Sequence, residues 1–79
     1  MVETRIAPRY LVSKPGTIEF LGGVFNCVVR NLSLTGAAIE VSNQAAIPES
    51  FILIIPEDGL RLLCRVVRRT EFRIGVAFD

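Results

Sequence analysis

The feature that most constrains this sequence is a regular alternation between short β-forming runs and turn signals built from glycine and proline. Turn signals stand at Pro15–Gly16, Gly22–Gly23, Gly36, Pro48 and Pro56–Gly59. The runs between them are rich in Val, Ile, Phe and Thr, and they have the length of β-strands rather than that of an amphipathic helix. The sequence therefore predicts an all-β domain.

Six strands are expected, namely Thr17–Leu21, Val24–Arg30, Ala37–Val41, Phe51–Ile55, Leu60–Thr70 and Arg73–Phe78. Gly22 and Gly23 are expected to supply the positive φ angles of a tight hairpin turn, and Ser42–Glu49 has room for one helical turn at most. Phe51–Ile55 is apolar on both faces, which predicts a strand covered on both sides. Short, closely connected strands predict an antiparallel barrel or sandwich. We favour the six-stranded antiparallel barrel because closure leaves no hydrophobic edge exposed.

The N-terminal residues do not fit this sheet. They are mostly polar, and Pro8 disfavours helix at Ala7. We therefore expect residues 1–14 to form a flexible, extended N-terminal arm and residues 15–79 to form a single barrel domain. A chain of 79 residues leaves no room for a second one.

Composition excludes several classes of function. The chain contains no histidine, which rules out histidine-based triads and His-containing zinc or iron sites. Nine basic and eight acidic residues leave a net charge of +1, so a general binder of polyanions is disfavoured. No apolar run approaches the roughly 18 residues of a spanning helix, and Met1–Arg5 shows no signal-peptide pattern. We expect a cytoplasmic protein without membrane contact.

The cysteines and the paired acidic residues are expected to be structural. Cys27 and Cys64 lie in apolar stretches and form no CxxC pattern; free buried thiols are favoured, with a disulfide as the alternative. Glu57 and Asp58 stand between Pro and Gly in a turn, so they are expected to be solvent-exposed rather than an acid–base pair. We find no nucleophile–base pair and no metal-ligand cluster, and we expect no catalysis, no metal and no cofactor.

Two polar features are candidates for function. Arg5 and Arg9 form an RxxxR pair on the arm, and Asn31, Ser33 and Gly36 form an NxSxxG loop between two apolar strands. Taken singly, two arginines near a terminus usually form a solvated tail, and Asn, Ser and Gly between strands usually form turns.

Together, in this order and on a small β-domain, the two motifs resemble the signature of the PilZ family, RxxxR followed by [D/N]xSxxG. Arg73–Phe78 also resembles the last barrel strand of that family, and the resemblance covers essentially the whole chain. It implies a six-stranded barrel that binds cyclic di-GMP, a bacterial second messenger, and signals to attached or neighbouring proteins.

The chemistry of the motif residues is compatible with this ligand. Guanidinium binds phosphate bidentately, stacks on purines and matches the O6/N7 edge of guanine, and Arg5 and Arg9 on an extended chain reach about 13 Å apart. The resemblance assigns Asn31 to the donor edge of guanine and Ser33 to a guanine or phosphate contact. Gly36 is expected to permit the turn or a close approach of the ligand.

The mechanism that we expect is closure of the arm. The arm is mobile without ligand, and it folds over the nucleotide against the Asn31–Gly36 loop, which changes the surface offered to a partner protein. The alternative is a PilZ-like barrel that does not bind nucleotide and acts as a protein-interaction module. A barrel that binds RNA or single-stranded DNA is disfavoured by the near-zero net charge. We expect a monomer or a weak dimer.

The basic residues near the C-terminus have two interpretations. Arginines recur from Arg61 to Arg73 with a single acidic residue, Glu71, among them. We expect exposed strand positions that keep the sheet soluble. The alternatives are accessory phosphate contacts or an RNA-binding face.

Overall fold

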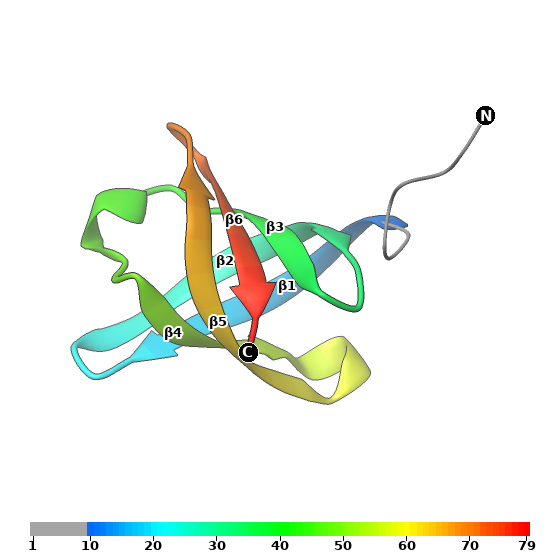
Figure 1. The fold of residues 1–79 in the computed structure, drawn as a ribbon. Helices are drawn as coiled ribbons and strands as arrows, with labels where there is room; N and C mark the ends of the chain where they lie inside the picture. Colours follow the sequence, from blue (N-terminus) through cyan, green and yellow to red (C-terminus); the bar gives the residue numbers. More distant parts are fainter. Residues whose placement is uncertain (1–9) are drawn as a thin grey trace.

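In the computed structural model, which describes residues 10–79 apart from the side chain of Gln44, six antiparallel strands close into a barrel (Figure 1). The strands are β1 (Tyr10–Phe20), β2 (Gly23–Leu32), β3 (Gly36–Glu40), β4 (Ser50–Ile55), β5 (Leu60–Arg69) and β6 (Arg73–Phe78). Their order around the barrel is β1-β2-β3-β6-β5-β4, and β4 pairs with β1 to close it. The expected six-stranded antiparallel barrel is confirmed.

Strand β1 begins at Tyr10, earlier than the sequence predicted. Tyr10 pairs with Leu32 and Leu11 pairs with Asn31 at the far end of β2. The boundary expected between residues 14 and 15 is therefore wrong, because residues 10–14 belong to the barrel. The rest of the expected arm, residues 1–9, lies outside the described residues.

The Pro15–Gly16 pair lies inside β1, which explains the misplaced boundary. β1 pairs with β4 only from Thr17 to Glu19, so Pro15 stands where β1 has one neighbouring strand, a position at which sheets tolerate proline. A Cβ atom on Gly16 would lie 3.1 Å from the carbonyl oxygen of Ile54. This pair permits close strand packing, whereas Pro–Gly in a sequence is usually a turn signal.

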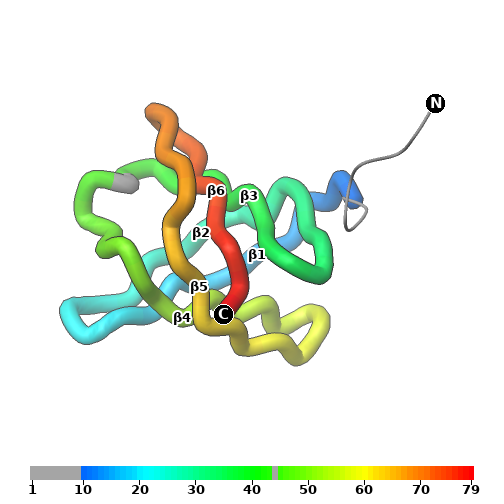
Figure 2. The backbone as a smooth tube through the Cα atoms, viewed as in Figure 1, coloured from blue at the N-terminus to red at the C-terminus, as the bar shows by residue number. Residues whose placement is uncertain are grey.

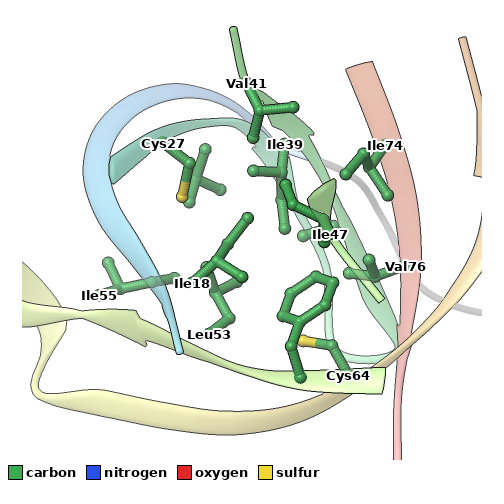
Figure 3. Close-up of a cluster of buried hydrophobic side chains, with 13 residues drawn as sticks. Ile18, Cys27, Ile39, Val41, Ile47, Leu53, Ile55, Cys64, Ile74 and Val76 are labelled. Carbon is green, nitrogen blue, oxygen red and sulfur yellow. The ribbon is translucent and has the colours of Figure 1, made fainter. Parts of the chain in front are cut away.

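Inward-facing side chains from all six strands fill the barrel (Figure 3). The core consists of Ile18, Cys27, Val29, Ala37, Ile39, Val41, Ile47, Phe51, Leu53, Ile55, Cys64, Ile74 and Val76. Pairs of these residues face each other across neighbouring strands, as Ile39 of β3 does with Ile74 of β6. Full burial of an aliphatic side chain stabilises a fold by about 1.5–3 kcal/mol, so this interior holds the register of the strands.

Both cysteines are free and buried, as expected. Burial raises the pKa of the Cys27 thiol to about 11, and burial likewise raises the pKa of Cys64 to about 11. Since the thiolate is the reactive form of cysteine, both side chains act as hydrophobic core residues at neutral pH.

The turns confirm one expectation and correct another. Gly59 ends the Pro56–Asp58 3-10 turn in the left-handed conformation, at φ 65°, and its N–H donates to the Pro56 carbonyl at 3.1 Å. No other glycine in residues 10–79 has a positive φ. The expected positive φ angles at Gly22 and Gly23 are therefore wrong: Gly23 already pairs with Phe20 as the first residue of β2.

Strand β4 also differs from the prediction in one respect. Phe51, Leu53 and Ile55 are buried, whereas Ile52 and Ile54 point outward and are half-buried. The expected cover on both faces is wrong, because the sheet closes on itself and encloses only its inner face.

Candidate functional site

The outer surface over β3 and β6 has a floor of very small residues. The register places Gly36 opposite Ala77 and Ala38 opposite Gly75, and these alternate with the buried positions of both strands. Because no side chain here is larger than a methyl group, the surface is hollowed between the taller residues of β2 and β5.

This hollow is a groove of about 510 Å³, which we call the β3–β6 groove. It is lined by Asn31, Ser33, Thr35, Gly36, Ala37, Ala38, Val67, Arg68, Thr70, Arg73, Gly75, Val76 and Ala77. Three of the five residues expected to bind ligand, Asn31, Ser33 and Gly36, are thus brought together on one groove. The other two, Arg5 and Arg9, lie outside the described residues.

Gly36 is needed for the close approach of β6. A Cβ atom at this position would overlap the carbonyl oxygen of Val76, while the φ angle of Gly36 is not left-handed. Close strand packing therefore accounts for glycine here without a ligand and without a special turn conformation.

Ser33 organises the loop between β2 and β3. Its hydroxyl accepts from the backbone N–H groups of Thr35 and Gly36, each at 3.2 Å, and donates to the Gly36 carbonyl at 3.2 Å. A serine hydroxyl has one proton and two lone pairs, so these bonds use its full capacity. A direct contact from this hydroxyl to a ligand would have to replace one of them.

Asn31 differs from Ser33 because its amide is available. The residue is half-buried on β2, opposite Ala38 of β3. No hydrogen bond within residues 10–79 engages its side chain, and no buried polar side-chain atom in that range lacks a partner. The Asn31 amide therefore faces solvent at the groove with its donor and acceptor capacity free.

The opposite wall of the groove is formed by two exposed arginines, Arg68 on β5 and Arg73 at the start of β6. A Cβ atom on Gly75 would lie 3.4 Å from Cβ of Arg68, so the arginine stands directly beside the glycine floor. Sequence reasoning placed both arginines in one basic stretch and did not separate them from their neighbours. Arg73 alternates with Gly75 on the outer face of β6, whereas Arg68 stands opposite Gly75 only through the register of β5 with β6, which no sequence pattern shows.

The chain leaves the barrel next to this groove. Tyr10 pairs with Leu32, the residue directly before Ser33, and the start of β1 lies at the same end of the barrel as the β2–β3 loop (Figure 2). Residue 9 is therefore joined to the barrel beside the Ser33 loop.

None of the helical segments in residues 10–79 has the length and apolar character needed to cross a bilayer. No group of three or more His, Cys, Asp or Glu residues in the same range is placed to hold a metal ion.

Comparison with solved structures finds a similar fold in the Borreliella burgdorferi PlzA protein, whose crystal structure was determined in complex with c-di-GMP. The TM-score is 0.75 at 22% sequence identity. The match covers 96% of this chain and 34% of the PlzA chain, so this chain spans about a third of that protein. No curated protein sequence matches.

The family comparison covers nearly the whole sequence. The family model of the PilZ domain matches residues 3–79. This range includes both sequence motifs and all six strands. The chain belongs to the PilZ domain family.

Proposed function

We propose that this domain is a receptor for cyclic di-GMP, without catalytic activity, that binds the nucleotide in the β3–β6 groove. The observation that carries the proposal is that Asn31, Ser33 and Gly36 line one groove, whose floor is made of small residues. Membership of the PilZ family and the complex of PlzA with c-di-GMP support the same ligand.

In this proposal Asn31 reads a guanine and the Ser33 loop presents backbone groups to the ligand. The Asn31 amide offers one acceptor and two donors, which suits the N1–H and N2–H donors and the O6 acceptor of guanine. Ser33 contacts guanine or phosphate by exchanging a loop hydrogen bond, and Gly36 keeps the floor of the groove low. The small floor lets a flat purine lie close to the sheet.

Arg5 and Arg9 supply charge from the other side. Each guanidinium binds a phosphate bidentately or stacks on a guanine. Tyr10 pairs with Leu32 beside the Ser33 loop, and Arg9 and Arg5 stand one and five residues before it in the sequence. Five residues of extended chain reach about 17 Å, which suffices in this proposal to bring both arginines over the groove. Closure of residues 1–9 over the nucleotide changes the surface offered to a partner protein in the bacterial cytoplasm.

Calorimetric titration with cyclic di-GMP tests the binding. The chain of residues 1–79 should bind with micromolar affinity or better, about −8 kcal/mol. Arg9→Ala should weaken binding at least about tenfold, since a hydrogen bond to a charged group contributes about 1.5–3 kcal/mol. Asn31→Ala should weaken it about two- to tenfold, since hydrogen bonds between neutral groups contribute about 0.5–1.5 kcal/mol. Arg61→Ala is the matched control, because Arg61 pairs with Glu19 and does not line the groove. Absence of saturable binding by the unaltered chain contradicts the proposal.

Trypsin digestion tests the closure separately. Saturating cyclic di-GMP should slow cleavage after Arg5 and Arg9 in the unaltered chain, and in Asn31→Ala the ligand concentration that gives half of this protection should rise by the same factor as Kd. Equal cleavage with and without ligand would show that the arm stays open.

The alternative, a barrel that acts through protein contacts alone, is favoured by a second hollow. It measures about 460 Å³ and is lined mostly by apolar residues, including Tyr10, Leu34, Leu60 and Phe78. Tyr10 and Leu34 are 63% and 87% exposed, so an apolar partner surface has access to them. If the calorimetric titration detects no cyclic di-GMP binding by either the unaltered chain or Arg9→Ala, the result would favour this function.

A further inference from the structure

We infer that Arg68 and Arg73 form a second cationic wall of the β3–β6 groove and bind the phosphodiester groups of the ligand from the side opposite Asn31. This inference rests on the proposed function, because it names further ligand-binding residues of the same site. Neither residue belongs to the RxxxR or NxSxxG motif.

The basic side chains of the barrel differ in whether they are paired. Of nine basic residues, two lie outside the described range, which leaves seven. Five of these form ion pairs with carboxylates, namely Lys14, Arg30, Arg61, Arg65 and Arg69. Arg68 and Arg73 are the two described basic side chains without a hydrogen bond or ion pair, and both line the groove.

The carboxylate that stands opposite Arg73 in the strand register is paired with another arginine. Glu40 of β3 stands opposite Arg73 of β6, yet Glu40 Oε1 accepts from Nε of Arg30 at 2.7 Å. Arg30 also donates from Nη1 to the Ser13 hydroxyl at 3.3 Å. Arg30 of β2 therefore neutralises Glu40, and the charge of Arg73 stays unneutralised at the groove.

Asn31 and Arg68 are aligned across the groove by the strand register. Asn31 pairs with Ala38, Ala38 with Gly75, and Gly75 with Arg68, so one row runs across β2, β3, β6 and β5. Three strand spacings of about 4.8 Å make this row about 14 Å long. A polar group stands at each end and only small residues lie between them, which suits a compact dinucleotide ring with guanine at one end and phosphate at the other.

Two unpaired cations beside one groove repel each other, and a bound dianion removes that repulsion. Arginine also suits phosphate better than lysine, because its planar fork donates two parallel hydrogen bonds to one phosphate group. Cyclic di-GMP carries one negative charge on each of two phosphodiesters, which matches the two guanidinium groups.

The test is calorimetric titration of Arg68→Ala, Arg73→Ala and the double variant with cyclic di-GMP. Each single substitution should weaken binding about 10-fold to 100-fold, the range expected for a lost charge-assisted hydrogen bond. Arg68→Lys should recover only part of the affinity, because it keeps the charge and loses the fork. The double variant should also lower the slope of log K against log salt concentration, since fewer charged contacts are made.

The control is again Arg61→Ala, which should bind like the unaltered chain and so exclude a general effect of positive charge. Thermal unfolding checks that the exposed substitutions leave the fold intact. Full affinity in the double variant overturns the inference but leaves the proposed function standing, provided that Arg9→Ala still weakens binding. No binding by the unaltered chain overturns both.

Discussion

The outer surface over β3 and β6 and the outer surface over β4 and β5 belong to the same closed sheet, but their side chains differ in size. Ala38 stands opposite Gly75 in the first region, whereas Ile52 stands opposite Leu63 in the second. Small residues hollow the first surface into a groove, and branched residues fill the second. Leu63 is 49% exposed there.

The two regions also differ in how charge is arranged. Arg61 of β5 forms an ion pair with Glu19 of β1 at 3.1 Å, and this pair neutralises the charge of Arg61 on the barrel surface. At the groove, Arg68 and Arg73 keep their charges unpaired. The core that holds the barrel together is made of inward side chains, so most outward residues, with Gly36 as an exception, are free to serve another purpose.

The largest effect, a loss of stability, is expected from a substitution at Gly36 on the groove floor. Gly36→Ala places a methyl group against the Val76 carbonyl, so β3 and β6 must separate, which should lower the free energy of unfolding by about 1–3 kcal/mol. A loss of that size lowers Tm by about 5–20 °C in a domain of this length. Circular dichroism melting measures it.

The matched control for this variant is Gly75→Ala. Its new Cβ would lie 3.4 Å from the Arg68 side chain, which is ordinary contact, so its Tm should fall much less. Equal melting temperatures for the two variants would show that close packing is not the reason for glycine at position 36.

Filling the groove should remove ligand binding without unfolding the protein. Ala38→Leu adds a branched side chain at a half-buried outward position of the floor, and it should weaken cyclic di-GMP binding at least about tenfold, or 1.4 kcal/mol. Ile52→Phe also enlarges a half-buried outward side chain, here on the β4–β5 surface, and should bind normally. Unchanged affinity in Ala38→Leu would place the ligand elsewhere on the barrel.

A smaller effect on cyclic di-GMP affinity is expected when Glu40 loses its ion-pair partner. Arg30→Ala removes the partner of Glu40, which can then pair with Arg73 and compete with the ligand. Since exposed ion pairs contribute about 0.2–1 kcal/mol, binding should weaken about two- to fivefold by calorimetry. Arg30→Ala combined with Glu40→Ala should restore the affinity. A double variant as weak as the single one would refute competition by Glu40.

The smallest effect is expected on the filled surface. Arg61→Ala breaks an ion pair whose side chains are 61% and 40% exposed. Because solvent screens such pairs, the free energy of unfolding should change by less than about 1 kcal/mol. Urea denaturation measures this change. A large loss of stability here would show that the two surfaces contribute to the fold in different ways.

Much of the fold was predictable from local patterns. Alternating apolar residues such as Ile39 and Val41 and the turn at Pro56–Gly59 indicated strands and their connections. Pro15–Gly16 misled the prediction, because a close approach to Ile54 of β4 requires the glycine within a strand. That contact lies far away in the sequence and leaves no local trace.

The candidate site was predictable in part. Asn31, Ser33 and Gly36 were found from their spacing, but the spacing did not reveal that the Ser33 hydroxyl is fully used inside its own loop. The special status of Arg68 and Arg73 was also hidden. Whether an arginine is paired depends on which carboxylate its strand neighbour presents, and the sequence does not state the register.

The sequence by itself determined the class of structure and the motif pair, because strand length, alternation and turn chemistry are local properties of the chain. The tertiary structure alone decided that Asn31 of β2 and Arg68 of β5 end one row across the groove. The physical reason is that cross-strand register is set by the packing of the inward side chains, and this packing exists only once the barrel has closed.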